Sequence, residues 1–134
     1  MELNGETLRF IREHCKDDVR SLALQAPKYP GVDMSVALTQ IAGRQAAAEK
    51  IPSWHEEEGV LYPRHLSLEQ CSSEATARYK ASIIPESSSG TLTDLTGGFG
   101  IDCAFLSPKF HHVTYVERQE VLCEIASHNF PLLG

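Results

Sequence analysis

The sequence lacks the features that would place it in a membrane or outside the cell. Its 134 residues contain no apolar run approaching the roughly 20 residues that a membrane-spanning helix needs. Residues 1–6 are polar and acidic, whereas a secretory signal begins with basic residues and continues with an apolar stretch. We therefore expect a cytoplasmic protein without a membrane partner.

The sequence also lacks clustered cations and closely spaced metal ligands. It has 12 lysines and arginines against 18 acidic residues, a net charge of -6, and no basic cluster of the kind that binds nucleic acid. Its four cysteines, at positions 15, 71, 103 and 123, contain no close pair suited to zinc. We predict reduced thiols, no metal site, and no strong binding of nucleic acid by this segment alone.

The chain divides into two predicted parts. Residues 1–85 are expected to form a mainly helical N-terminal region, and residues 86–134 to alternate strands with helices. Asp33 is a suitable N-cap, and Ser67 begins a capping box with Gln70. The predicted helices cover residues 8–15, 17–25, 33–52, 67–83, 101–107 and 120–130, the predicted strands residues 92–95 and 112–117, and the predicted loops residues 53–59 and 86–90.

Apolar residues at helical spacing predict which sides of these helices are buried. The predicted apolar face of the first helix consists of Leu8, Ile11 and Cys15, and that of the last helix of Val121, Leu122, Ile125 and Ala126. Segment 53–59 contains three glutamates and is expected to be exposed. Segment 71–80 is expected to be an amphipathic helix packed on the sheet, or else a segment that closes over a ligand.

The most informative segment is a glycine-rich turn between a predicted strand and a predicted helix. Gly97, Gly98 and Gly100 stand in four positions, and glycine is used where φ must be positive or where a ligand approaches closely. Such a turn presents backbone N–H groups and the positive end of a helix to a ligand. Glu117 ends the next strand, where a carboxylate can accept from two ribose hydroxyls. This order is typical of the first half of a nucleotide-binding α/β fold.

The spacing of the glycines separates classes of nucleotide site. A dinucleotide fingerprint needs a third glycine at position 103, which is cysteine, and a P-loop needs a lysine after the glycines, which is absent. Instead, Asp94 stands four residues before Gly98. Asp94 could also be a simple turn residue, and Asp102 is expected to stabilise the first helical turn rather than to bind a ligand.

Two short motifs resemble those of a known enzyme family. Asp94–Gly100 resembles the first motif of class I S-adenosylmethionine-dependent methyltransferases, and Val116–Arg118 resembles their second, ribose-binding motif. More narrowly, the chain is similar to a methyltransferase group of Bacteroidetes that carries a THUMP-like domain further along. The lead-in Cys71–Lys80 also resembles that group. The resemblance covers residues 67–134 well and residues 1–66 loosely.

The resemblance implies a fold and a cofactor. The fold class would be α/β, with an N-terminal helical region followed by the first β-α-β-α half of a Rossmann-like methyltransferase fold, its sheet incomplete. Residues 86–134 would be the start of the domain that binds S-adenosylmethionine. Gly98 and Gly100 would pass close to the methionine part of the cofactor, and Asp94 would orient it. The residues implied to bind the cofactor are Asp94, Thr96, Gly97, Gly98, Gly100, Glu117 for the ribose and Arg118 beside the adenine. Thr96 stands where many members have glycine.

The resemblance also implies what this sequence does not contain. Substrate-binding motifs would follow the fourth strand, so we name no catalytic residue and expect the N-terminal portion of a longer methyltransferase, acting on RNA through downstream parts. Two strands with open edges lead us to expect that the isolated segment self-associates. The alternatives are a fragment of an NAD-type oxidoreductase and a non-catalytic helical interaction module.

Overall fold

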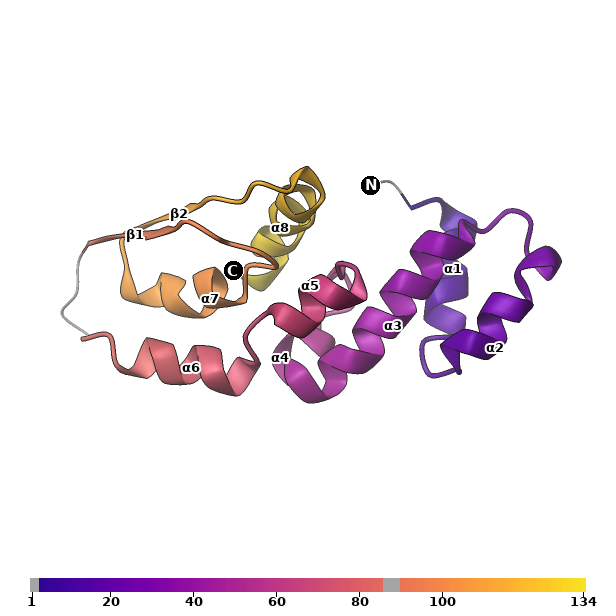
Figure 1. Ribbon diagram of the computed structural model, residues 1–134, viewed down its shortest axis with the longest axis horizontal. Helices are drawn as coiled ribbons and strands as arrows, with labels where there is room; N and C mark the ends of the chain where they lie inside the picture. Colours follow the sequence, from indigo (N-terminus) through magenta and orange to yellow (C-terminus); the bar gives the residue numbers. More distant parts are fainter. Residues whose placement is uncertain (1–2, 86–89) are drawn as a thin grey trace.

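The structure is a computed structural model that describes residues 3–85 and 90–134. It is mainly helical, and its helices α1 to α6 precede a β-α-β-α succession with a two-stranded parallel sheet. The first helices lie at one end of an elongated molecule and the sheet at the other (Figure 1). The predicted fold class is therefore confirmed. Within the described residues, none of the helices has the length and apolar character needed to cross a membrane.

Three capped helices form the N-terminal end of the molecule. They are α1 (Gly5–Glu13), α2 (Val19–Leu24), which is followed by the 3-10 turn Ala26–Lys28, and α3 (Met34–Lys50). Each has a side-chain N-cap, provided in turn by Asn4, Asp18 and the predicted Asp33. The predicted apolar face of α1 is wrong at Leu8, which is 43% exposed, whereas Ile11 packs against the buried cluster that contains Phe10. The side of α1 that carries Phe10 faces the protein interior, and the Phe10 ring contacts the Tyr29 ring.

Three short helices follow, and they differ from the predictions. They are α4 (Pro52–His55), α5 (His65–Gln70) and α6 (Glu74–Ser82). The loop predicted for residues 53–59 is wrong in its first half, because Pro52 begins α4 and buries Trp54. The continuous helix predicted from Ser67 is also wrong. Ser73 accepts a hydrogen bond from the Thr76 amide and so caps a new helix after a break.

The α/β part follows the predicted order. It consists of β1 (Thr91–Asp94), α7 (Ile101–Leu106), the 3-10 turn Ser107–Lys109, β2 (His112–Tyr115) and α8 (Glu120–Leu133). The predicted apolar face of α8 is correct except at Val121, which is 56% exposed because the helix packs through Leu122, Ile125 and Ala126. Of the predicted connector, residues 86–89 lie outside the described part.

The two faces of the sheet differ in what they contact. On one face Asp94 contacts Cys103 of α7 and the Tyr115 ring contacts Phe130 of α8. The opposite face is exposed and polar, and its residues are Thr91, Thr93, His112 and Thr114. Helix α6 packs on α7 rather than on the sheet, as seen in Figure 1. The predicted packing of segment 71–80 on the sheet is therefore wrong.

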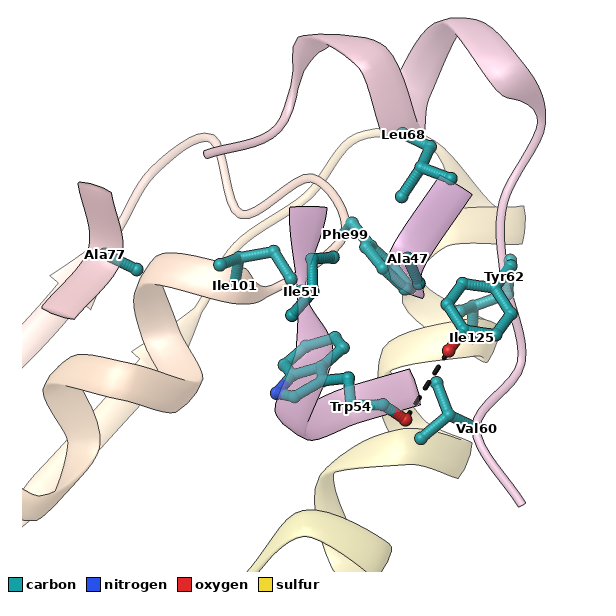
Figure 2. Packing of buried hydrophobic residues seen from close by; sticks show 10 residues of the cluster. All are labelled: Ala47, Ile51, Trp54, Val60, Tyr62, Leu68, Ala77, Phe99, Ile101 and Ile125. Atoms are coloured by element: carbon teal, nitrogen blue, oxygen red, sulfur yellow. Dashed lines mark hydrogen bonds between the residues drawn. The ribbon is translucent and has the colours of Figure 1, made fainter. Parts of the chain in front are cut away.

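One hydrophobic cluster joins the helical lead-in to the α/β part. Phe99, from the glycine turn, lies 5.1 Å from Trp54 of α4 and 5.8 Å from Tyr62, measured between ring centroids. The full set of buried cluster members, drawn in Figure 2, is Ala47, Ile51, Trp54, Val60, Tyr62, Leu68, Ala77, Phe99, Ile101 and Ile125. This core draws residues from both sides of position 85, and the domain boundary predicted there stays a prediction.

Two side-chain amides reinforce this connection. Gln40 of α3 donates to the Tyr62 carbonyl at 2.9 Å and accepts from the Tyr62 amide at 2.8 Å. Asn129 of α8 makes the same pair of bonds with Leu61, both at 2.8 Å. The extended segment at Leu61 and Tyr62 is therefore held between α3 and α8, and its backbone polar groups are satisfied without a sheet.

Candidate functional site

The glycine turn is held in place by the second strand and the last helix. The Gly97 amide donates to the Val116 carbonyl at 2.8 Å, and the Tyr115 hydroxyl donates to the Gly98 carbonyl. Burial raises the pKa of the Tyr115 phenol, so this hydroxyl stays protonated. A side chain at Gly97 would overlap the Tyr115 ring. Gly97 is therefore required by packing within the protein.

The other two glycines have positive φ angles, which favour glycine. Gly100 has φ of 92°, and a β-carbon there would lie 2.7 Å from the Phe130 ring. Gly98 has φ of 55°, and the only atom within 4 Å of a β-carbon there is the Thr96 carbonyl oxygen, at 3.8 Å. Of the three glycines, Gly98 alone thus combines a left-handed conformation with open space beside it.

Glu117 lies directly against the glycine turn. One carboxylate oxygen accepts from the Gly98 amide at 3.0 Å, and the other accepts from the Gln119 amide at 2.7 Å. These bonds, that from Gln119 first, hold the pKa of Glu117 below its usual value. Glu117 is therefore a carboxylate at neutral pH, placed at the end of the strand by two backbone groups.

Asp94 lies at the start of the same turn. Its Oδ1 accepts from the Thr96 amide at 3.1 Å, and the Cys103 thiol lies 3.5 Å from its Oδ2. Burial, assisted by the negative charge of Asp94, raises the pKa of Cys103 to about 12, so this cysteine stays a thiol. The bond to Thr96 gives Asp94 the role of a turn residue, and the same side chain also lines a cavity.

Asp102 does more than stabilise its own helix. Its Oδ2 accepts from the Lys80 ammonium at 3.0 Å and from the Ser72 hydroxyl at 3.3 Å, which ties α7 to α6. Its Oδ1 is buried and has no hydrogen-bond partner among the described residues. Asp102 thus connects the glycine turn to the segment that precedes α6.

These residues surround a cavity of about 360 Å3, which we call the acidic cavity. Its lining comes from the glycine turn, the end of β2 and the break between α5 and α6, and consists of Ser67, Gln70, Cys71, Ser72, Asp94, Thr96, Gly97, Gly98, Phe99, Gly100, Ile101, Asp102, Glu117, Gln119 and Leu122. Six of the seven predicted cofactor-binding residues are brought together here. Arg118 is exposed and outside the lining, and no observation tests its predicted position beside an adenine.

The sequence reasoning assigned no site role to Ser67 and Gln70, which line the cavity from α5. The Lys50 ammonium positions this segment by donating to the carbonyls of Leu68 and Glu69, at 2.7 and 2.8 Å. Beyond the break, Ser73 caps α6, and the Ser-x-x-Thr spacing could have revealed the new helix start. The alternative that segment 71–80 closes over a ligand is favoured by Cys71 and Ser72, which line the cavity.

The charges lining the acidic cavity all have one sign. Asp94, Asp102 and Glu117 contribute three carboxylates, and the lining includes no lysine or arginine. Lys80 neutralises Asp102 in part, and the charge of the adjacent Arg118 adds to the lowering of the Glu117 pKa, while both residues lie outside the lining. Residues 3–85 and 90–134 contain no group of three or more His, Cys, Asp or Glu side chains placed to hold a metal ion. The cavity therefore suits an organic ligand that carries positive charge.

Comparison with solved structures gives a match in sequence and in fold. The crystal structure of a "putative methyltransferase" from Porphyromonas gingivalis W83 superimposes with a TM-score of 0.76 and 31% sequence identity. The match covers 95% of this chain and 31% of that chain, so this chain spans about a third of the length of the Porphyromonas protein. No protein-family model and no curated protein matches the chain. The chain thus resembles part of a methyltransferase-like protein.

Proposed function

We propose that this chain forms the S-adenosylmethionine-binding portion of a methyltransferase. The observation that carries the proposal is the acidic cavity, in which the Gly98 backbone and the Glu117 carboxylate meet. The match to part of a methyltransferase-like structure supports it independently. The cavity volume of about 360 Å3 lies within the range of about 300–1,000 Å3 that small-molecule sites occupy.

The residues present fit this cofactor by charge and by position. S-adenosylmethionine carries a sulfonium and an ammonium group against a single carboxylate, so it is cationic overall, and the cavity offers three carboxylates. Glu117 would hold the ribose hydroxyls, Gly98 would let the methionine part approach, and Asp94 would face its ammonium group. When bound, the cofactor would supply an electrophilic methyl group for transfer to an acceptor.

The same charges argue against an NAD-type cofactor. A pyrophosphate carries two negative charges, which the carboxylates of Asp94, Asp102 and Glu117 would repel in this partly enclosed space. The third glycine of a dinucleotide fingerprint is replaced by Cys103, whose thiol is buried beside Asp94. We therefore place the oxidoreductase second.

Several finer parts of the proposal are supported by the sequence resemblance alone. They are RNA as the acceptor, a THUMP-like domain further along the chain, and the position of Arg118 beside the adenine. Self-association is supported by the unpaired outer edges of β1 and β2 in the two-stranded sheet. A non-catalytic helical module stays the third candidate, and it would bind neither cofactor.

The test is calorimetric titration of S-adenosylhomocysteine, the demethylated cofactor, into the longest natural polypeptide that contains these residues. We expect micromolar affinity, at least tenfold weaker binding of NAD, and loss of binding in Glu117→Ala. Glu120→Ala is the matched control, because Glu120 lies three residues along the chain and outside the cavity lining. Equal binding by both variants, or no binding by a folded protein, would show that the acidic cavity is not the cofactor site.

A further inference from the structure

A second cavity adjoins the acidic cavity and differs from it in charge. It measures about 380 Å3 and shares Ser67, Gln119 and Leu122 with the acidic cavity. A third cavity of about 350 Å3 continues from it along α3 and shares Ser35, Thr39, Pro63 and Arg64. We call these two cavities together the α3 groove. The groove therefore leads away from the cofactor site along the surface of α3.

The lining of the α3 groove combines apolar surface with hydrogen-bonding groups. Val36, Tyr62, Pro63 and Ile125 provide apolar surface in the part next to the acidic cavity. Hydroxyls and an amide stand among them, on Ser35, Thr39, Ser67 and Gln119. A flat ring with polar edges matches such a lining, because its faces contact the apolar side chains while its edges form hydrogen bonds.

The only charged side chains that line the groove are cationic or can become so. Within the described residues, its lining contains no aspartate or glutamate, whereas it contains Arg64 and His65. His65 lies 3.7 Å from Glu69, across one turn of α5. The Arg64 side chain has no hydrogen-bond or ion-pair partner among the described residues, and both cavities of the groove include Arg64 in their lining.

The position of Arg64 explains why its guanidinium is available. Arg64 is the N-cap residue of α5, but its side chain forms no cap hydrogen bond. Pro63 precedes it and is buried, which fixes the backbone at this point. A guanidinium presents a rigid fork of donors that matches a phosphate, and a phosphate meets no carboxylate in this groove.

We propose that the α3 groove binds the methyl acceptor and that this acceptor carries a nucleotide phosphate, held by Arg64. This proposal rests on the proposed function, because a site for a methyl acceptor has to adjoin the site of the methyl donor. The two cavities then divide the charges of the reaction partners: a cationic cofactor lies among carboxylates, and an anionic acceptor lies beside the guanidinium. Gln119, which lines both cavities, would stand between them.

The net charge of -6 sharpens this expectation. The chain as a whole repels a polyanion, so attraction has to come from a local contact rather than from a basic surface. One arginine makes one phosphate contact, for which the logarithm of the affinity falls by about 0.7 per decade of salt on a single strand. The affinity for a nucleotide should therefore change little with salt concentration, and the part of it that the phosphate contributes should depend on Arg64.

The test uses the same natural polypeptide, saturated with S-adenosylhomocysteine, and four probes. They are nucleoside 5′-monophosphates, the matching nucleosides, a random octaribonucleotide and inorganic phosphate. All four are followed by calorimetry, and the three organic probes also by saturation-transfer NMR. The variants are Arg64→Ala, Arg64→Lys, which keeps the charge but loses the fork, and Arg20→Ala. Arg20 is the matched control, because it is exposed on α2 and lines no part of the groove.

We expect the phosphate-bearing nucleotides to bind more tightly than the nucleosides. Arg64→Ala should weaken them roughly tenfold or more, Arg64→Lys less, and Arg20→Ala not at all. Tighter binding of the octaribonucleotide would identify nucleic acid rather than free nucleotide as the source. Equal binding of inorganic phosphate and nucleotide, or equal affinity in Arg64→Ala, would overturn the proposal. Binding of S-adenosylhomocysteine by each variant is measured in parallel, so that failure of the groove and failure of the cofactor site are distinguished.

Discussion

The acidic cavity has two sides that are built in different ways. On one side, the glycine turn is held by the residues that end the neighbouring strand, through bonds from Gly97 to Val116 and from Gly98 to Glu117. On the other side, the last turn of α5 is held by Lys50 of α3, which donates to the Leu68 carbonyl. The first side can be recognised from a motif, whereas the second depends on how the helices pack.

Phe99 joins these two sides, since it leaves the turn and packs among the rings of α4 and the following segment. A glycine turn needs no aromatic residue to approach a ligand, so Phe99 serves packing. The acidic cavity therefore depends on the helical lead-in for its second side and for holding its first side in place. Residues 67–72 are thus as much a part of the site as the glycines.

The largest effect is expected from removal of the Phe99 ring, because this ring connects the two sides of the acidic cavity. Phe99→Ala should destabilise the protein by about 3–5 kcal/mol, because a fully buried ring leaves a cavity between the two sides. Urea unfolding followed by Trp54 fluorescence and by far-UV circular dichroism measures this loss. The two signals should change together in the wild-type protein, since Trp54 is the sole tryptophan and lies in the shared core. Separate transitions would mean that the two parts fold independently.

A smaller effect is expected within the glycine turn, where neighbouring glycines should respond differently. Gly97→Ala would overlap the Tyr115 ring and should cost about 1–3 kcal/mol of stability. Gly98→Ala meets no such contact, and its positive φ should cost about 1–2 kcal/mol. The β-carbon at position 98 would occupy the open space in which the ligand is proposed to lie. Relative to the stability that each variant loses, Gly98→Ala should therefore lose more affinity for S-adenosylhomocysteine than Gly97→Ala. Thermal unfolding and calorimetry on both variants check this, and the reverse order would contradict the roles assigned here.

The smallest expected effect concerns the pH dependence of stability at Glu117. Hydrogen bonds lower the pKa of Glu117 in the folded protein, so its contribution is complete above the unfolded value and is lost as the pH falls through the folded value. Glu117→Gln should therefore be less stable than the wild type at neutral pH, by at most about 1 kcal/mol because the group is largely open to solvent. This difference should shrink as the pH falls through the lowered pKa of Glu117 in the folded protein. A constant difference from pH 7 to pH 3 would show that the charge of Glu117 does not support the turn.

The sequence predicted the elements whose signals are local. Asp33 caps α3 as expected, and the strand, glycine turn, helix and second strand occur in the expected order. The motif also predicted that Asp94, the glycines and Glu117 lie together, and all of them line the acidic cavity. They do so because the carboxyl ends of two parallel strands meet at the same edge of the sheet. No packing information was needed for these predictions.

The failures concern choices that tertiary packing decides. Trp54 is followed in sequence by a histidine and three glutamates, and these polar neighbours predicted a loop. In the structure the Trp54 ring is buried against Phe99 and belongs to the hydrophobic core. Ser67 fits a capping box, but it lies inside α5, and the serine that caps a helix here is Ser73, at the start of α6. The break that results is what places Cys71 and Ser72 in the cavity. Recognising this side of the site required the packed helices.

Hydrogen–deuterium exchange of the longest natural polypeptide, with and without S-adenosylhomocysteine, tests the central claim most directly. If both sides of the acidic cavity bind the cofactor, the ligand should slow exchange in residues 94–102 and 117–119 and also in residues 67–72. Residues 19–24 of α2, which lies at the end of the molecule opposite the sheet (Figure 1), provide the internal reference and should not change. Protection of the glycine turn without residues 67–72 would contradict the two-sided site, and protection of neither would contradict the cofactor site as a whole.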